Sequence, residues 1–490
     1  MDFTPVTAVW EITMGCNMRC DHCGSACAAP LPDELTTAEA LDLCDALKRV
    51  GLRWITLSGG EPLTRKDWPL IAGRLSRNGI KPNIITNGWL VDEDMVATAR
   101  ENGVETISIS LDGNRETHDA IRKKGAFDKV INAFKVLKEA GHTSASNTTV
   151  TRHNLDQLDE IKAILLENGV DLWQIQIGLP MGNLAKDREA VVDPATIDYL
   201  LDYCHRTTLE GKIKVFPADC LGYFTRKEGL VRRLSMGSDT EVVWQGCNAG
   251  KRSFGILHNG DILGCTSIRD SGMIEGNIKT RPLYDIWHDP GAFDWARSMR
   301  KTDLEGLCSR CAYGETCLGG CPNTRLTING SIYSDNPWCA YHNVMEATRE
   351  QLTRYDDPDD LMTTARSFAD RQEWQSACLV LERVLELDAN HLSALELYGF
   401  TSFQAGNFVQ AAQANQSILK QDPENAYALK GLGLSLHRQG RSLEGIGFLE
   451  SATRQDSPFR RDSLYDLAVV YQELGRPDKA GQILEQAGTG

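Results

Sequence analysis

Three cysteines near the amino terminus have a spacing that suits iron–sulfur chemistry. Cys16, Cys20 and Cys23 form a CxxxCxxC pattern directly after a β-rich run. Three thiolates on a four-iron cluster leave one iron without a protein ligand, so that a small molecule can bind there. A zinc knuckle is the weaker interpretation, because zinc sites favour paired CxxC units. The pattern therefore predicts a catalytic cluster.

A second motif, Gly59-Gly60-Glu61-Pro62, ends the next β-rich run. Adjacent glycines let a ligand approach the backbone closely, and the glutamate offers an acceptor to an ammonium group. The motif is weak when it stands alone. Because it follows a strand, as the cysteines do, we expect the two motifs to lie together.

Together the two motifs resemble the radical S-adenosylmethionine (SAM) superfamily, from the first residues to about residue 230. The resemblance implies a partial (βα)6 barrel of the TIM type and a [4Fe-4S] cluster whose open iron binds the amino and carboxylate groups of SAM. It also implies contacts to SAM from Gly59 to Glu61 (amino group), Ser110 and Arg152 (carboxylate) and Asn87 (ribose region). One departure is His22, because relatives usually place Tyr or Phe before the third cysteine.

Seven further cysteines follow at irregular intervals. They are Cys247, Cys265, Cys308, Cys311, Cys317, Cys321 and Cys339. Their spacing resembles the SPASM extension of radical SAM enzymes, which holds two auxiliary iron–sulfur clusters, expected here as [4Fe-4S]. The resemblance implies an outer cluster on Cys308, Cys311, Cys317 and Cys339, and an inner cluster on Cys247, Cys265 and Cys321.

The inner cluster needs a fourth ligand that the pattern does not supply. Some relatives use a cysteine at the position that is Glu241 here. Cys220 is one candidate, and an open coordination site is the other. Among the remaining cysteines, Cys44 and Cys378 lie in helical patterns and suit buried apolar positions.

Cys27 and Cys204 are also expected to be structural. Cys27 lies so soon after the cluster loop that a place at a substrate channel is the alternative.

The elements that must position these motifs are parallel βα units. The expected strands are 6–13, 53–57, 83–86, 106–111, 143–151 and 172–177. Thr36 or Thr37 and Asp92 are expected to begin helices that end at Gly51 and Gly103. Parallel strands with right-handed crossovers place their carboxyl ends at one edge of the sheet, so the motifs should meet there.

Polar side chains alternate with apolar ones along two of these strands. Ser108, Ser110 and Asp112 alternate with isoleucines and leucine, which indicates one polar face, either inside the barrel or towards solvent. Gln174 and Gln176 alternate in the same way. They face the barrel interior or belong to an ordinary edge strand.

Three domains are predicted from changes in residue composition and hydrophobic periodicity along the chain. These are a radical SAM partial barrel over 1–235, a SPASM auxiliary-cluster domain over 236–350, and an all-α solenoid over 357–490. The last shows three columns with spacings of 34, 34 and 35 residues: Leu361, Leu395, Leu429 and Leu464; Ala365, Gly399, Gly433 and Ala468; Ala377, Ala411, Gly445 and Ala480. The columns resemble tetratricopeptide repeats, in which small residues let paired helices pack closely.

Composition narrows the class of partner. The chain has 490 residues and a formal charge of −15, which argues against nucleic acid as a partner. No export signal or run of about 18 apolar residues is present, which argues against a membrane and predicts a cytoplasmic protein. Fifteen cysteines in such a chain favour cluster ligation over disulfides.

The resemblance implies an oxidoreductase that cleaves SAM to a 5′-deoxyadenosyl radical, with a flavodoxin- or ferredoxin-type electron donor. Enzymes of this layout commonly mature peptides or proteins by thioether or carbon–carbon crosslinks or by side-chain oxidation, so a peptide or protein substrate is expected. The helical repeats present a groove suited to docking it. Alternatives are a small-molecule substrate, such as a tetrapyrrole or amino sugar, and a non-catalytic redox sensor. No catalytic acid or base stands out.

Overall fold

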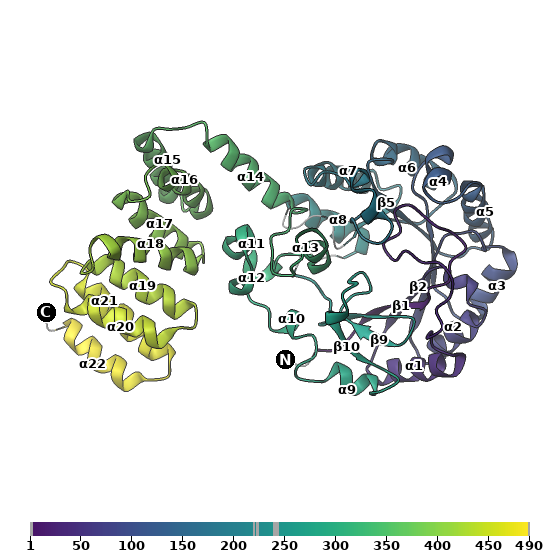
Figure 1. Cartoon of the computed structure of the whole chain (residues 1–490), viewed down its shortest axis with the longest axis horizontal. Helices are drawn as coiled ribbons and strands as arrows, with labels where there is room; N and C mark the ends of the chain where they lie inside the picture. Colours follow the sequence, from purple (N-terminus) through teal and green to yellow (C-terminus); the bar gives the residue numbers. More distant parts are fainter. Residues whose placement is uncertain (1–2, 219–220, 222–224, 239–244, 489–490) are drawn as a thin grey trace. The chain divides into compact units, whose positions relative to one another are not determined.

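The computed structural model describes residues 3–218, 221, 225–238 and 245–488 (Figure 1). It divides the chain into two compact units. One consists of Met1–Met299 and Thr316–Asn343, and the other of Arg300–Glu315 and Val344–Gly490.

The first unit is built on one sheet that, within the described ranges, has ten strands in the order β10-β9-β8-β1-β2-β3-β4-β5-β6-β7. The strands are β1 Thr7–Thr13, β2 Trp54–Gly59, β3 Lys81–Thr86, β4 Thr106–Ser110, β5 Ser144–Val150, β6 Leu172–Ile177, β7 Lys214–Pro217, β8 Ser253–Ile256, β9 Asp261–Leu263 and β10 Ile274–Asn277. Strands β1 to β7 pair in parallel in chain order, and β8 joins β1 in parallel. The six expected strands are confirmed.

Strand β7 is a seventh parallel strand that the sequence analysis missed. It is only four residues long and ends in Pro217, so it is too short to show an alternating pattern. It follows a fifteen-residue helix, α7 Thr196–Glu210, and so completes one more strand-helix-strand step than the six units expected.

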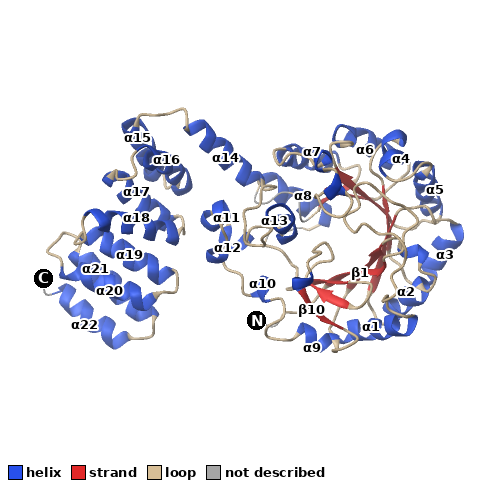
Figure 2. Cartoon of the chain, viewed as in Figure 1, coloured by secondary structure: helices blue, strands red, loops and turns tan. Residues whose placement is uncertain are grey.

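Helices cover the outer side of the curved sheet (Figure 2). They are α1 Thr37–Arg49, α2 Trp68–Arg77, α3 Glu93–Glu101, α4 Arg115–Ile121, α5 Ala126–Glu139, α6 Leu158–Glu167, α7 Thr196–Glu210 and α8 Arg226–Met236. Thr36 caps α1 in a capping box with Glu39, and Asp92 caps α3 through the Met95 amide. Both predicted helix starts are confirmed.

The core lies between the sheet and these helices. Trp10 of β1, Ile109 of β4 and Trp173 of β6 are completely buried in it. Ser108 and Ser110 alternate with the buried isoleucines, as expected for strand residues that point to opposite faces. Their hydroxyl groups therefore belong to the inner face of the sheet, on the side away from the helices.

Short elements dominate the region after β8. They include α9 Leu283–Trp287, α10 Asp294–Arg297, α12 Gly314–Cys317 and α13 Pro322–Asn329. Trp287 packs its ring against Phe254 and Phe293 at centroid distances of 5.3 and 5.1 Å. This aromatic group anchors the region to the sheet, because Phe254 lies in β8.

The second unit holds the repeats as four helix pairs. The pairs are α15 Pro358–Asp370 with α16 Trp374–Leu387, α17 Leu392–Gln404 with α18 Phe408–Gln421, α19 Ala426–Arg438 with α20 Ser442–Arg454, and α21 Arg460–Glu473 with α22 Pro477–Gly488. A Cβ added to Gly433 would lie 2.7 Å from the Gly445 carbonyl oxygen. The small residues of the columns therefore permit close helix packing, as predicted.

Helices α11 Gly306–Arg310 and α14 Ala340–Leu352 precede the repeats in the chain. Among the described residues, every helix is too short or too polar to cross a membrane.

Candidate active site

The loop after β1 brings the first three cysteines together. Cys16 and Cys23 pack beside buried Cys20 in a small apolar cluster that includes Met18 and Ala126. The loop is held by hydrogen bonds from the Cys16 amide to the Ala28 carbonyl and from the Cys23 amide to the Cys20 carbonyl, at 2.8 and 3.2 Å. The predicted cluster ligands thus share one half-buried patch.

Two of these thiols, Cys16 and Cys20, need a nearby positive charge to ionise. Burial raises the pKa of Cys20 to about 11, and burial also raises the pKa of Cys16. The Arg122 guanidinium lies 4.0 Å from the Cys20 sulfur and opposes the rise. Iron bound by the thiolates supplies the remaining charge, so this donor set fits an iron–sulfur cluster.

The Gly-Gly-Glu-Pro motif, at the end of strand β2, lies against the cysteine loop that follows β1. The amides of Gly60 and Glu61 donate to the carbonyls of Thr13 and Gly15 at 2.7 and 2.8 Å. A Cβ on Gly60 would lie only 2.2 Å from the Gly15 oxygen, and one on Gly59 2.2 Å from the Thr13 oxygen. These two glycines therefore allow the backbone of the cysteine loop to pack closely against the motif. From the sequence, they were expected to allow the close approach of a ligand.

The Glu61 carboxylate is buried beneath this motif. It accepts hydrogen bonds from the Asn87 and Leu63 amides at 2.8 and 3.2 Å and from the Thr86 hydroxyl at 2.8 Å. Burial raises its pKa to about 7, although the three donors oppose the rise. Since a carboxylate has about four acceptor positions, one remains for an ammonium group.

Asn87 ties the loop after β3 to the cysteine loop. Its side-chain amide donates to the Asn17 oxygen at 2.7 Å, and its own oxygen accepts from the Trp89 amide at 3.0 Å. The cysteine loop, the glycine motif and Asn87 therefore form one connected edge at the carboxyl ends of β1, β2 and β3, as the topology predicts.

The other two predicted SAM contacts differ in their surroundings. Ser110 is buried at the carboxyl end of β4, opposite Asn147 of β5. Arg152 is exposed after β5, and its Nε donates to the Val191 carbonyl at 2.9 Å. The structure thus brings Ser110 to the strand-end edge, whereas the Arg152 guanidinium is engaged by the chain itself.

A buried network of charged side chains, centred on Asp112, lies next to the cysteine loop. Asp112, after β4, is fully buried and accepts from Arg122 Nε at 2.5 Å, from His22 Nε2 at 2.8 Å and from the Thr149 amide at 2.9 Å. Burial alone would raise the pKa of Asp112, but Arg122 and then His22 hold it far below its usual range. Sequence reasoning missed Arg122, because an arginine after a short polar helix looks like a surface residue.

A second buried pair links the cysteine loop to the segment after β9. Glu11 of β1 is 4% exposed and accepts from both terminal nitrogens of Arg269. The Arg269 guanidinium also donates to the Ser25 hydroxyl at 2.5 Å. Arg269 follows Cys265 by four residues, so one arginine connects a predicted inner-cluster loop to the first cysteine loop. Spacing gave no signal for it.

Three of the seven later cysteines lie together: buried Cys317 packs with Cys321 and Cys339. The Cys247 loop approaches them, because a Cβ on Gly246 would lie 3.0 Å from the Thr316 carbonyl oxygen.

The Cys265 loop lies beside the Cys247 loop. A Cβ on Gly264 would be 3.4 Å from the Ala249 Cβ. Cys308 and Cys311 belong to the second unit. Cys220 and Glu241, considered for the fourth inner ligand, lie outside the described residues.

The remaining cysteines are buried. Cys44 and Cys204 belong to the core of the first unit, and Cys378 lies inside the first repeat. The burial predicted for Cys44 and Cys378 is confirmed, and Cys204, expected to be structural, is buried as well. Cys27 is also buried and donates a hydrogen bond to Cys23, which lowers the pKa of Cys23 to about 5.

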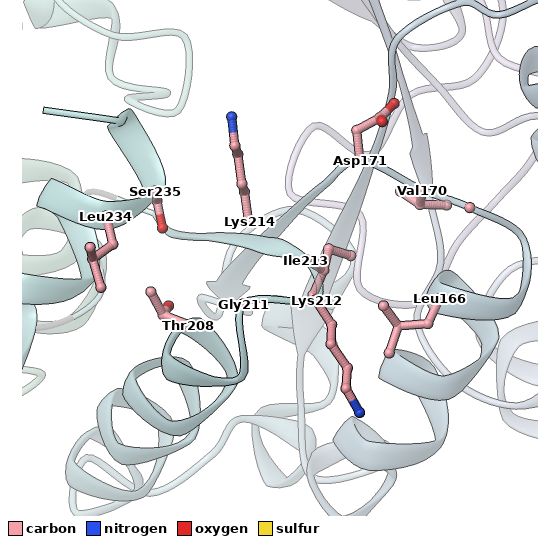
Figure 3. A pocket seen from close by; sticks show the side chains of 11 residues that line it. Leu166, Val170, Asp171, Thr208, Gly211, Lys212, Ile213, Lys214, Leu234 and Ser235 are labelled. Carbon is pink, nitrogen blue, oxygen red and sulfur yellow. The ribbon is translucent and has the colours of Figure 1, made fainter.

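A separate cavity of about 590 Å³ lies at the opposite edge of the sheet (Figure 3). Its lining includes Asp171 and Lys214, at the amino ends of β6 and β7, and Thr208 of α7. Ligands of parallel sheets bind at the carboxyl ends of the strands. We therefore assign the chemistry to the cysteine edge.

Comparisons with known proteins agree with this assignment. Residues 10–165 match the family model of the radical SAM superfamily, and residues 247–312 match that of an iron–sulfur cluster-binding domain, SPASM. Residues 362–426, 401–458 and 462–488 match tetratricopeptide repeat models.

Curated relatives and solved structures match about two thirds of the chain or slightly more. The AdoMet-dependent heme synthase of Methanosarcina barkeri is 31% identical over 70% of this chain and 98% of its own length. The mycofactocin maturase MftC of Mycolicibacterium smegmatis is 29% identical over 68% of this chain and 82% of its own. Streptococcus suis SuiB bound to precursor peptide SuiA shares the fold, with a TM-score of 0.55 and 20% identity over 68% of this chain and 75% of that chain.

Proposed function

Because this chain belongs to the radical SAM superfamily and carries a SPASM iron–sulfur cluster-binding domain, we propose that it oxidatively modifies a peptide or protein. As a member, it is an enzyme that binds SAM at a [4Fe-4S] cluster and holds auxiliary iron–sulfur clusters. The modification would be a thioether or carbon–carbon crosslink, or the oxidation of a side chain.

One observation carries the proposal: the cysteine loop, the glycine motif and Asn87 form a single hydrogen-bonded edge. When bound, the cluster and SAM supply one low-potential electron and a 5′-deoxyadenosyl radical that takes hydrogen from the substrate. The chain's own task is to fix SAM and substrate beside each other and to exclude water.

We assign the residues of this edge as follows. Cys16, Cys20 and Cys23 hold the cluster. The amino group of SAM lies against Gly59 to Glu61, where Glu61 keeps one free acceptor position. Asn87 borders the ribose region.

The carboxylate of SAM would meet Ser110 at the end of β4. For the Arg152 guanidinium to bind this carboxylate through Nε, the hydrogen bond from Nε to the Val191 carbonyl must break.

The later cysteines are proposed to hold the two auxiliary clusters in the sets given by the sequence pattern. Packing of Cys317, Cys321 and Cys339 in one patch supports a cluster-binding role. These clusters would take an electron from the substrate radical or bind substrate directly. A flavodoxin- or ferredoxin-type protein would reduce the first cluster.

Two observations favour a peptide or protein substrate. Several relatives are named maturases. The second is the repeats themselves, which match tetratricopeptide repeat models. Helical repeats present extended surfaces that suit macromolecules better than small molecules.

A tetrapyrrole is the second candidate substrate. The specific observation that favours it is the 31% identity to a protein named heme synthase. A further relative, from the same organism, is named Fe-coproporphyrin III synthase.

The test compares the two substrate classes directly. The enzyme is co-expressed anaerobically with each short peptide encoded beside its gene, and purified enzyme is separately given iron coproporphyrin III, SAM and a reductant. Intact masses are measured, with Cys20→Ala as the control. Loss of hydrogen from a peptide, absent with Cys20→Ala, supports the proposal. Turnover of the porphyrin without any peptide change contradicts it.

A further inference from the structure

The segment that carries Cys308 and Cys311 belongs to the same compact unit as the repeats. It spans Arg300–Glu315, and its only α-helix lying wholly within it, α11, has five residues. So short a segment cannot build a hydrophobic core of its own. Its conformation must therefore be fixed by contacts with the residues around it.

One anchor lies between the two cysteines. Arg310 Nη1 donates to Glu382 Oε1 of α16 at 2.8 Å, and Arg349 of α14 donates to the other Glu382 oxygen at 2.8 Å. The Tyr398 hydroxyl of α17 also donates to Glu382, at 2.9 Å. Glu382 is thus a half-buried acceptor for three donors, and one of these donors sits inside the Cys308-x-x-Cys311 turn.

A second anchor lies at the start of the segment. Lys301 is 3% exposed, and its Nζ donates to Asn407 Oδ1 at 2.9 Å and to the Gly406 carbonyl at 3.3 Å, in the turn between α17 and α18. Gln375 of α16 joins both anchors, because it donates to the Arg310 carbonyl at 3.3 Å and accepts from Asn407 at 3.5 Å.

We propose that the first two repeats hold the Cys308-x-x-Cys311 turn in the conformation that binds an iron–sulfur cluster, and that Glu382 is the positioning residue that does so through Arg310. The inference rests on the proposed ligand set, in which Cys308 and Cys311 bind the outer cluster. It gives the repeats a task besides docking a partner.

The local chemistry of the turn suits a cluster. The Tyr313 amide donates to the Cys311 sulfur at 3.4 Å, a hydrogen bond typical of cluster thiolates. Glu382 completes the arrangement by fixing the guanidinium of Arg310 against α16 of the repeats.

The test uses the full-length chain, reconstituted with iron and sulfide without oxygen. Bound iron per chain and the electron paramagnetic resonance spectrum of the reduced protein are measured for Glu382→Ala, Glu382→Gln and Arg310→Ala. Cys308→Ala shows what loss of the outer cluster looks like. Glu386→Ala is the matched control, because Glu386 lies on the same helix and forms an exposed pair with Arg383.

We expect Glu382→Ala and Arg310→Ala to lose up to about one third of the iron, the share of one cluster in three, with the spectral change seen in Cys308→Ala. Glu382→Gln keeps an acceptor oxygen and should retain more iron, and Glu386→Ala should match the unmodified chain. Normal iron and spectra in both Glu382→Ala and Arg310→Ala overturn the proposal.

A melting curve followed by helical circular dichroism separates positioning from folding. If Glu382→Ala lost iron only together with helix stability, while Arg310→Ala kept its iron, the proposal would also be wrong. Gln375→Ala removes only the hydrogen bond to the Arg310 carbonyl and should show a smaller loss of the same spectral signal. None of these readouts needs a substrate, so they do not depend on whether the modified molecule is a peptide.

Discussion

Replacement of Asp112 by asparagine tests how the cysteine loop is held. The Asp112 carboxylate is fully buried and lies 2.5 Å from Arg122 Nε and 2.8 Å from His22 Nε2. Its pKa lies far below the usual range despite burial, chiefly because of Arg122. The stabilisation is therefore complete above the unfolded pKa of about 3.9 and is lost only as the pH falls towards the depressed value. At neutral pH it is fully present.

The size of the effect follows from the unpaired charge. Asp112→Asn keeps the shape but leaves Arg122, whose side chain is only 9% exposed, without its counter-ion. Breaking a buried pair in this way costs about 3 to 5 kcal/mol. In a domain of about 300 residues, with an unfolding entropy of about 2.1 cal/mol/K per residue, this lowers the melting temperature by roughly 5 to 8 °C.

The assay is scanning calorimetry of the reconstituted chain, with iron content measured in parallel. Asp128→Asn is the matched control, because Asp128 forms an exposed pair with Arg115 and should cause no resolvable shift. If Asp112→Asn melted within about 1 °C of the unmodified chain, the cost of an unpaired Arg122 would have been misjudged. The pair would then contribute no more than a surface contact.

Three further predictions concern other parts of the chain. Burial raises the pKa of Glu61 to about 7, so SAM affinity, measured by calorimetric titration, should increase as the pH rises through this value, and Glu61→Gln should remove the dependence. Gly60→Ala places a Cβ 2.2 Å from the Gly15 oxygen, so reconstituted iron should fall even though the cysteines remain. Gly445→Val drives atoms into the Gly433 carbonyl, 2.5 Å from a Cβ, and should lower the melting temperature of the repeats in circular dichroism while the iron content is unchanged.

Sequence patterns predicted the parts of the fold that repeat along the chain. The six strands and the small-residue columns of the repeats each depend on local periodicity, and the structure bears them out. The short strand β7, Lys214–Pro217, was not predicted, because four residues are too few to show an alternation of buried and exposed side chains. Long periodic elements can be read from one sequence, whereas short elements are defined by the neighbours with which they pair.

The sequence predicted those residues of the candidate site that belong to a recognisable motif. Cys16, Cys20 and Cys23 could be found from spacing, but Arg122 and Arg269 could not. Arg122 and Asp112 are ten positions apart at the two ends of a short helix, α4, whereas Arg269 and Glu11 are 258 positions apart. No local pattern encodes a pair as distant as Arg269 and Glu11, since only the folded chain brings its two members together.

Each of three cysteine loops has a half-buried or buried cation from outside its own motif. Arg122 lies 4.0 Å from Cys20, Lys251 interacts with Cys247, and Lys301 interacts with Cys311. Burial lowers the pKa of both lysines, and the neighbouring cysteines oppose this. Thiolate-bound clusters carry net negative charge, so a nearby cation reduces the cost of burying them and raises their reduction potential. Because Lys301 is itself anchored on the repeats through Asn407, we expect changes in that turn of the repeats to alter the charge beside Cys311.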